Sequence, residues 1–194
     1  MFSSETYSIE DCKFYDNTSS DKSNNYTTNS NIALSFDTDH YVAVSSVGNN
    51  VSSNFYGLLK PNIAFSNDII IECDIKQTVT STATYGISIV NNTGVSTTNV
   101  SKYYQLSNYN GNKGLTTNPW TEKRTTGSLS NDTWYHFKLT ITNGSGTGEI
   151  KQGNTTVYND SLSYSQFSSL AYICLTASQY PNTIQFKNFK VKPL

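Results

Sequence analysis

Residues 131–160, NDTWYHFKLTITNGSGTGEIKQGNTTVYND, contain the pattern that decides the fold. In the middle of this stretch every second residue is apolar, namely Phe137, Leu139 and Ile141, and the residues between them are polar. A period of two residues is typical of a β-strand that is buried on one face. The sequence therefore predicts a strand here, with its apolar side against a core.

Two turn motifs divide the rest of this stretch. Asn-Gly-Ser-Gly at 143–146 and Gly-Asn at 153–154 consist of residues that favour tight turns. They predict a second strand over 148–152 and a third that begins at Thr155. Three consecutive strands joined by tight turns form an antiparallel meander.

The C-terminal segment 183–194, TIQFKNFKVKPL, predicts a further strand with an irregularity. Ile184 and Phe186 have one parity, whereas Phe189 and Val191 have the other. A strand with such a change of phase contains an extra residue. We therefore expect a β-bulge near Asn188.

Alternating apolar residues predict several more strands. The first is a hairpin, with Ile32, Leu34 and Phe36 before a turn at 37–39 and a strand at 41–44 after it. Short strands are predicted at 55–59 and 103–106. Three further strands are expected to point their apolar residues inward: Ile69, Ile71, Cys73 and Ile75 in the first, Tyr85, Ile87 and Ile89 in the second, and Ala171, Ile173 and Leu175 in the third. An Asn-Gly pair at 110–111 suits a tight turn. The segment 115–129 is either a long loop or a short hairpin.

These patterns predict an all-β protein. About ten to thirteen strands, with no helical periodicity longer than a turn or two, favour two antiparallel sheets packed face to face. No linker is visible, so we expect residues 1–194 to form a single β-sandwich domain. Residues 1–30 are expected to be partly irregular, because the segment after Tyr15 is too polar to pack and predicts a surface loop.

The charge pattern excludes two classes of partner. The chain has 13 Lys and Arg against 14 Asp and Glu, and no basic run exceeds Lys123-Arg124. Phosphate binding needs clustered cations, so we expect no nucleic-acid partner. No apolar run approaches the about 20 residues of a membrane-spanning helix, so we expect no membrane insertion.

The first 18 residues have neither a basic leader nor an apolar core and predict no signal peptide. A piece of a larger secreted protein, or a chain assembled into a virus particle, would reach the outside without one. Cys12, Cys73 and Cys174 have the spacing of neither a disulfide ladder nor a metal site. Cys73 and Cys174 lie in apolar strand patterns and are expected to be buried free thiols.

The strand that opens with Trp134-Tyr135, the hairpin after it and the last strand with Phe189-Lys190-Val191 resemble the concanavalin A-like, laminin G-like jelly-roll superfamily. The resemblance is clearest over 69–89 and 133–194. It implies a jelly-roll sandwich whose C-terminal strand pairs beside the N-terminal part. Members bind carbohydrate or protein, cleave polysaccharides, or act as spacers in adhesins and viral fibres, so the fold does not specify the function.

Glu72-Cys73-Asp74 resembles the start of the Glu-X-Asp-X-X-Glu signature of the retaining β-glucan hydrolases of this fold. Those enzymes use one glutamate as nucleophile and another as acid. Here the last position is Gln77, and we expect Lys76 to compete as an ion-pair partner of the carboxylates. The motif therefore predicts a charged outer face of a sheet rather than hydrolysis.

The two histidines, His40 and His136, lie far apart in the sequence, and no nucleophile motif such as Gly-X-Ser-X-Gly accompanies them. We expect His136 to face outward from its strand and His40 to belong to a turn. A metal site made by the pair is not expected. The sequence thus predicts a protein without enzymatic activity.

Sugar recognition combines an exposed aromatic ring with nearby amides, hydroxyls or carboxylates. Trp120, in the polar segment NPWTEKR, is the best candidate for such a ring, whereas Trp134 is expected to serve packing. The predicted ligand-binding residues are Trp120, Tyr103, Tyr109, Tyr180, Asn108, Asn110 and Asn118.

The chain predicts no cofactor, but a structural calcium ion is one interpretation of its acidic turns. Asp16, Asp21, Asp37, Asp39 and the loop 108–112 offer the oxygen ligands that calcium prefers. The other interpretation is that Asp and Asn here are ordinary turn residues. No spacing matches an EF-hand loop.

Together these features predict a non-enzymatic, extracellular recognition module that binds glycan or another surface ligand such as a cell-surface receptor. We expect it in a viral receptor-binding tail-fibre protein or a microbial adhesin, on a virion or cell surface. A trimer or other oligomer would form through sheet surfaces, because coiled-coil heptads are missing. The alternatives are a purely structural virion or cell-surface domain and a polysaccharide-degrading enzyme.

Overall fold

The computed structural model describes residues 14–26, 28, 32–45, 68–78, 84–90, 102–109, 111–117, 121–163, 172–178 and 182–194. These residues form one short 3-10 helix and thirteen strands: β1 (Phe14–Asp16), η2 (Ser23–Asn25), β2 (Ile32–Asp37), β3 (His40–Ser45), β4 (Ile69–Gln77), β5 (Thr84–Val90), β6 (Lys102–Tyr109), β7 (Asn112–Thr117), β8 (Thr121–Thr126), β9 (Tyr135–Thr142), β10 (Ser145–Gln152), β11 (Thr155–Ser163), β12 (Tyr172–Ser178) and β13 (Asn182–Pro193). The strand predicted at 55–59 lies outside the described residues.

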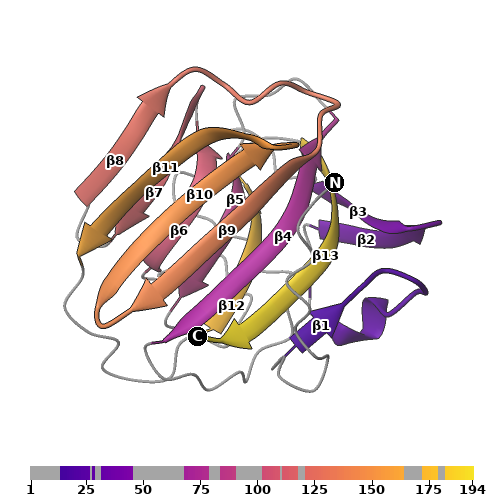
Figure 1. Ribbon diagram of the computed structural model, residues 1–194. Coiled ribbons are helices and arrows are strands. Elements are labelled where there is room, and N and C mark those ends of the chain that lie inside the picture. The colour runs from indigo at the N-terminus through magenta and orange to yellow at the C-terminus, as the bar shows by residue number, and fades with distance from the viewer. Residues whose placement is uncertain are drawn as a thin grey trace.

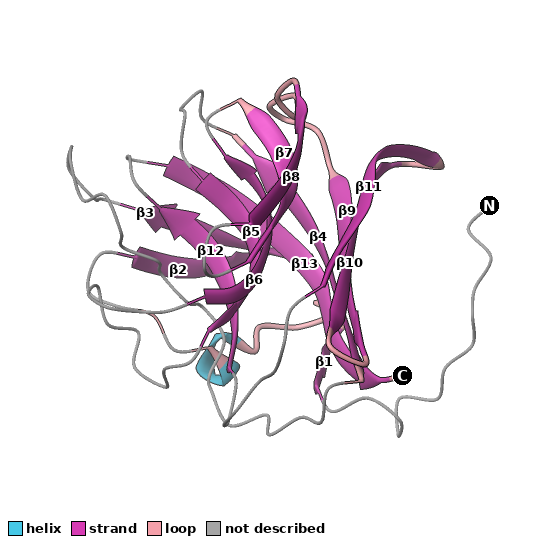
Figure 2. Cartoon of the chain, turned by 90° about the vertical axis from the view of Figure 1, so that its left-hand side faces the viewer, coloured by secondary structure: helices cyan, strands magenta, loops and turns pink. Residues whose placement is uncertain are grey.

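The strands form two antiparallel sheets. Sheet A has the order β11-β10-β9-β4-β13-β3-β2, with β1 paired to β13, and faces the viewer in Figure 1. Sheet B has the order β12-β5-β6-β7-β8 and lies behind it. Figure 2 shows the two layers from the side. The predicted all-β sandwich is confirmed, and no helix in the described part of the chain is long and apolar enough to cross a membrane.

The core lies between the sheets and follows the predicted alternation. In β9, Phe137, Leu139 and Ile141 are fully buried, and the residues between them are half-buried on the opposite face. The inward residues of β4 are also fully buried, namely Ile69, Ile71, Cys73 and Ile75. Cys73 is a free thiol, as predicted. Leu106 and Leu115 of sheet B belong to the same buried cluster, so both sheets present apolar residues to one core.

Strand β10 begins earlier than predicted, at Ser145, because only Asn143 and Gly144 form the turn. The next glycines have a packing role. A Cβ atom on Gly146 would lie 2.4 Å from the Tyr104 ring, and one on Gly148 would lie 2.7 Å from Leu106. These glycines let large residues of sheet B approach β10 closely.

The predicted bulge in the last strand is confirmed. Between Lys187 and Lys190 the pairing of β13 with β4 shifts its register, and Asn188 has a φ of 53°. The extra residue lets Phe186 and Phe189 both point into the core. Before the bulge β13 pairs with β3, and after it with β1.

The segment after Tyr15 is not the simple surface loop that its polarity predicts. Asp16 is fully buried, and its carboxylate accepts hydrogen bonds from the hydroxyls of Tyr26 (3.0 Å) and Tyr41 (2.7 Å). Burial and the nearby carboxylate raise the pKa of both phenols, so they stay protonated donors. This buried contact ties the N-terminal segment to β3.

The alternatives for residues 115–129 are decided in favour of a hairpin, because β7 and β8 are paired strands. Strand β11 of sheet A lies against this hairpin. The Tyr158 hydroxyl accepts a hydrogen bond from Leu115 N (2.9 Å) and donates one to Lys123 O (2.7 Å). Burial raises the pKa of Tyr158 to about 12, so the hydroxyl stays protonated and keeps the hydrogen bond to Lys123 O that links the two sheets.

Candidate functional site

The face of sheet B that points away from sheet A is polar, although it is buried. Along its strands the inward residues, such as Tyr85, Leu106 and Leu115, belong to the core. Five outward residues are each at most 3% exposed: Thr84, Ser88, Gln105, Ser107 and Thr116. We call these five residues the polar face.

Several atoms of the polar face have no protein partner. Thr84 Oγ1, Gln105 Nε2 and Ser107 Oγ are buried and make no hydrogen bond with the described residues. A buried polar atom without a partner costs about 1–3 kcal/mol. Native proteins rarely leave such atoms without a reason, and a ligand or a bound water is the usual one.

Ser107 lies at the centre of this face, between two glycines on the neighbouring strands. It pairs with Gly86 of β5 on one side and with Gly114 of β7 on the other. A Cβ atom on Gly86 would lie 2.1 Å from Leu106 O, and one on Gly114 would lie 2.5 Å from Lys123 O. Neither position can carry a side chain, so the Ser107 hydroxyl has no side chain beside it on these two strands.

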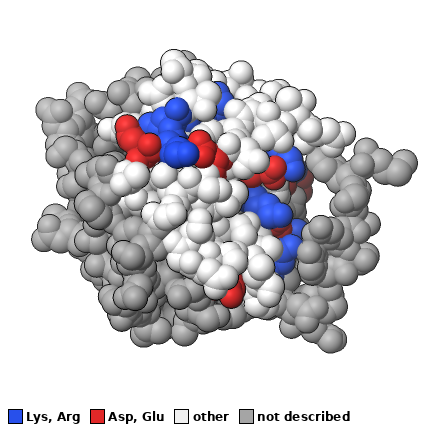
Figure 3. Space-filling view, turned by 60° about the vertical axis from the view of Figure 1, so that its left-hand side comes forward, with Lys and Arg blue, Asp and Glu red and all other residues white. Residues whose placement is uncertain are grey.

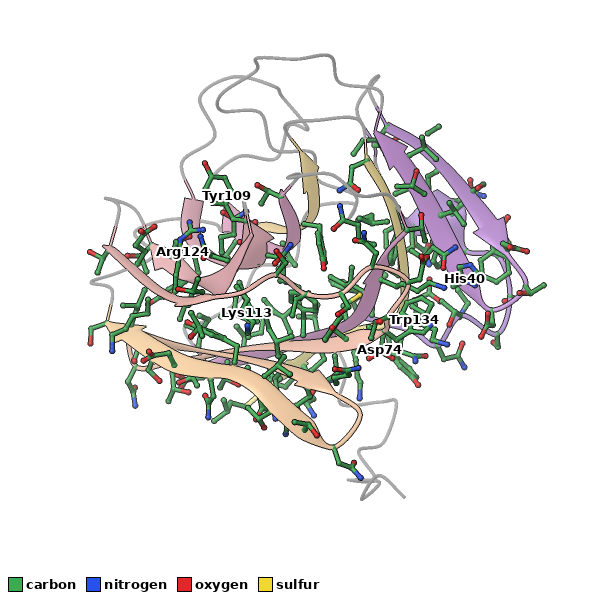
Figure 4. All side chains as sticks on the ribbon, turned by 90° about the horizontal axis from the view of Figure 1, so that it is seen from above. His40, Asp74, Tyr109, Lys113, Arg124 and Trp134 are labelled. Atoms are coloured by element: carbon green, nitrogen blue, oxygen red, sulfur yellow. The ribbon has the colours of Figure 1, made fainter. Side chains whose placement is uncertain are left out.

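Arg124 and Tyr109 form the charged end of the same face (Figure 4). Gly114 also makes room for the Arg124 stem, since its Cβ would lie 2.8 Å from Arg124 Cγ. The guanidinium carbon lies over the Tyr109 ring, 4.5 Å from its centroid. Arg124 Nε donates a hydrogen bond to Glu122 Oε2 at 2.7 Å. The arginine side chain, 13% exposed, is thus held by a ring and by a carboxylate.

The structure describes two of the seven predicted ligand-binding side chains. Tyr109 is half-buried, and Arg124 covers one side of its ring. Asn108 points the other way, is 4% exposed and accepts a hydrogen bond from Leu129 N. Tyr103 belongs to β6, but its side chain is outside the description. The other four lie outside the described residues: Trp120, Asn110, Asn118 and Tyr180.

Sequence reasoning did not identify the polar face or Arg124. Gln105 and Ser107 are common strand residues, and nothing in their neighbourhood distinguishes a buried polar face from one in water. The alternation of Glu122, Arg124 and Thr126 is a signal for a strand that was available in the sequence. This alternation could have placed Arg124 on one face of a β-hairpin, the same face of the sheet that Tyr109 of β6 occupies.

The outer face of sheet A is charged instead. Glu72, at its centre, lies 3.1 Å from Lys190, 3.7 Å from Lys192 and 3.8 Å from Lys138. Lys76, the partner expected from the sequence, lies over the Trp134 ring instead. Burial opposes ionisation of Glu72, but Lys190 and Lys192 outweigh it and lower the pKa of the carboxyl. A glycosidase acid needs a raised pKa, so Glu72 is unsuited to that role.

Trp134 also belongs to the outer face of sheet A rather than to the core. Lys187 Nζ and Lys76 Nζ lie 4.6 Å and 5.0 Å from its ring centroid, and the His40 ring meets it edge-on. Trp134 does serve packing, as expected, but its ring packs against the ammonium groups of two lysines. Asp39 completes the group through Lys187 and His40. Figure 4 shows this group far from Tyr109 and Arg124.

The histidines are both held by carboxylates. His136 faces outward, as predicted, with Nδ1 2.8 Å from Asp74 Oδ1. His40 is the first residue of β3 rather than a turn residue, and its Nδ1 lies 2.9 Å from Asp39 Oδ1. Within the described ranges, no three His, Cys, Asp or Glu side chains come together to hold a metal ion. Asp16, one suggested calcium ligand, accepts tyrosine hydroxyls instead.

Charged side chains are otherwise sparse. Figure 3 shows one side of the molecule, on which positive and negative side chains lie next to each other within a mostly uncharged surface. One of the mixed pairs in the structure is Lys123 with Asp160, at 3.0 Å. Such a mixed surface lacks the clustered cations on which binding of nucleic-acid phosphates depends.

The fold is shared with solved structures. A protein of unknown function with a galectin-like fold from Bacillus subtilis is 11% identical and has a TM-score of 0.63, and the match covers 94% of this chain and 96% of that one. The exoplasmic/lumenal domain of VIP36 in its Ca²⁺-bound form is 10% identical, with a TM-score of 0.60 and coverage of 95% and 93%. The family 7 alginate lyase A1-II′ is 11% identical, with a TM-score of 0.58 and coverage of 87% and 85%.

These similarities establish that the chain has the concanavalin A-like jelly-roll fold, as the resemblance implied. At such low identity they show the fold alone. The sequence matches no protein-family model. It matches no curated protein sequence either. The setting in a viral tail fibre or an adhesin, the single domain and the trimer therefore stay predictions.

Proposed function

We propose that the protein is a carbohydrate-binding module and that its ligand binds on the polar face of sheet B. The observation that carries this proposal is that three of the eight buried side-chain atoms without a hydrogen-bond partner in the described part of the chain, Thr84 Oγ1, Gln105 Nε2 and Ser107 Oγ, lie on one face of one sheet. A ligand rich in hydroxyl groups can both donate to and accept from such atoms. Carbohydrate is the ligand class that fits an uncharged array of amides and hydroxyls best.

The similar structures support the ligand class without showing it for this chain. The VIP36 domain was also solved in a Ca²⁺/Man3GlcNAc-bound form, so a protein with this fold holds an oligosaccharide. The alginate lyase was solved in complex with its product. We infer a lectin-like role rather than cleavage. Glu72, the carboxylate whose sequence context resembles a hydrolase signature, lies on the other sheet and is paired with lysines.

The aromatic residues predicted from the sequence have a place in this proposal. Tyr103 belongs to β6, the strand of Gln105 and Ser107, and Trp120 lies in the segment that connects β7 to β8. We propose that these rings, with Asn110 and Asn118, contact the sugar beside the polar face. Tyr180, in the connection from β12 to β13, is the most distant of the predicted set along the strand order of sheet B.

A glycan array with the full chain, followed by calorimetry on the best ligand, tests this proposal. Gln105→Met removes the amide at nearly constant volume and is expected to weaken binding about tenfold or more, because the sugar hydroxyls lose a buried partner. Thr147→Val is the matched control, since Thr147 bonds Ser161 on the outer face of sheet A. Absence of binding to any glycan, or wild-type affinity in Gln105→Met, would count against the polar face.

The same experiment addresses the alternative of an enzyme. Incubation of each bound glycan with the protein, followed by chromatography, shows whether the glycan is cleaved. We expect unchanged glycan. We further propose an extracellular or lumenal setting, since glycans are displayed there, and a cell-surface glycan as the partner.

A further inference from the structure

We propose that the ligand is an acidic oligosaccharide, whose carboxylate binds Arg124 next to the polar face. This inference rests on the proposed function and adds the chemical class of the sugar. It starts from the contacts that hold the arginine. Its guanidinium carbon lies over the Tyr109 ring, 4.5 Å from the centroid, and Nε donates a hydrogen bond to Glu122 at 2.7 Å.

These contacts use one side of the guanidinium and one of its five N–H donors. Within the described residues neither Nη atom of Arg124 makes a hydrogen bond, and the side chain as a whole is 13% exposed. A guanidinium fork is planar, always charged and matched to the two oxygens of a carboxylate. Stacking on Tyr109 fixes the fork before the ligand arrives, so little side-chain entropy is lost on binding.

The fork lies in line with the polar atoms that lack partners. Tyr109, Ser107 and Gln105 alternate along β6 and therefore face the same side of sheet B. Successive members of this row are about 7 Å apart, because a strand rises about 3.4 Å per residue. A sugar beside Tyr109, the half-buried member of the row, can thus direct a carboxylate toward the guanidinium and a hydroxyl along the row toward Ser107.

The surroundings favour an anion at this end of the face. Gly114 supports the arginine stem, because a Cβ there would lie 2.8 Å from Arg124 Cγ. Glu122 is the competing carboxylate, but its side chain is 52% exposed and contacts only the Nε edge. A ligand carboxylate could accept a hydrogen bond from each Nη atom without displacing Glu122 from Nε.

The test compares uronate oligosaccharides with their carboxyl-reduced, neutral counterparts, using galacturonate, glucuronate, mannuronate and guluronate oligomers and the full chain. We expect at least one acidic oligomer to bind tenfold or more tighter than its reduced form. Arg124→Gln should abolish that difference. Lys123→Gln is the matched control, because it removes the same charge from the next residue, which pairs with Asp160 instead.

A second variant keeps the test independent of folding defects in Arg124→Gln. Glu122→Gln removes the competing carboxylate and should tighten binding of the acidic oligomer several-fold while leaving the neutral form unchanged. Equal binding of acidic and reduced oligomers, or binding of neutral glycans alone, would overturn this inference and leave the proposed function standing. Failure of every glycan to bind would overturn the proposed function itself.

Discussion

The outer face of sheet A carries charged side chains that pair with one another, whereas the outer face of sheet B carries Arg124 and Glu122 at one end and uncharged side chains elsewhere among the described residues, three of which have buried atoms without partners. On sheet A, Glu72 meets lysines from two neighbouring strands, and Asp74 meets His136 and Asn188. On sheet B, Gln105 and Ser107 lie on the central strand, each at most 2% exposed.

The difference separates stabilisation from binding. Charged side chains that pair across neighbouring strands stabilise the sheet that carries them, and their paired atoms are not available to bind a ligand. Polar atoms that are buried without partners lower stability, and they persist where function needs them. The two faces therefore predict opposite responses to mutation: loss of a paired charge should destabilise sheet A, whereas loss of one of the three polar atoms without partners should not destabilise sheet B.

The largest effect is expected at Gly86, which pairs with Ser107 at the centre of the polar face. Alanine there would place Cβ 2.1 Å from Leu106 O, at a φ of 154° that only glycine tolerates. We expect Gly86→Ala to lower the free energy of unfolding by about 4 kcal/mol, the sum of backbone strain and overpacking. Urea denaturation followed by tryptophan fluorescence measures this change.

Gly153→Ala is the control for backbone strain alone. Gly153 has a φ of 56°, but nothing lies within 4 Å of a Cβ at this position. We expect a loss of about 1 kcal/mol. Equal losses in the two variants would show that the space around Gly86 is less restricted than the contacts at Leu106 indicate.

The next largest effect is expected at the centre of sheet A. Glu72→Gln removes the negative charge from three lysines, and Lys192 among them is only 5% exposed. Since the other two lysines are about a third exposed, we expect a loss of about 2 kcal/mol, less than for a fully buried pair. Glu149→Gln, which breaks the surface pair with Lys151, should cost about 0.5 kcal/mol or less.

The contribution of Glu72 should also depend on pH. Its pKa in the folded state lies below that of the unfolded chain, because the attraction of Lys190 and Lys192 outweighs burial. The carboxylate therefore stabilises the fold above its unfolded pKa of about 4.3, and this stability is lost as the pH falls through the lower folded value. The unfolding free energies of wild type and Glu72→Gln should converge below about pH 4. A constant difference down to pH 3 would contradict this.

The sequence predicts sheet A well because its signal is local. Burial on one face repeats every two residues, so β4 and β9 are visible in their apolar alternation, and the change of phase around Asn188 reveals the bulge. The start of β10 was missed for a physical reason. Gly146 and Gly148 resemble turn residues, but they are glycines because Tyr104 and Leu106 of the other sheet pack on them.

The polar face could not be predicted in the same way. Alternation shows that Ser107 and Leu106 point to opposite sides of a strand, but it does not show that both sides are buried. The stacking of Arg124 on Tyr109 depends on the pairing of three strands, β6, β7 and β8, which local periodicity does not contain. Aromatic residues can be proposed as sugar contacts from their residue type alone. A serine or threonine hydroxyl indicates a binding site only once the structure shows that it is buried without a partner.

Ser107→Ala should have the smallest effect on stability and the opposite sign. Its hydroxyl is buried and has no partner within the described residues, so its removal ends the cost of desolvation without breaking a hydrogen bond. We expect the variant to be more stable by about 1 kcal/mol and to bind glycan more weakly. Thr147→Ala, which removes a hydroxyl bonded to Ser161 on sheet A, should instead be less stable by about 0.5 kcal/mol. If Ser107→Ala destabilised the protein as Thr147→Ala does, the hydroxyl would have a structural partner, and the contrast between the two faces would lose its physical basis.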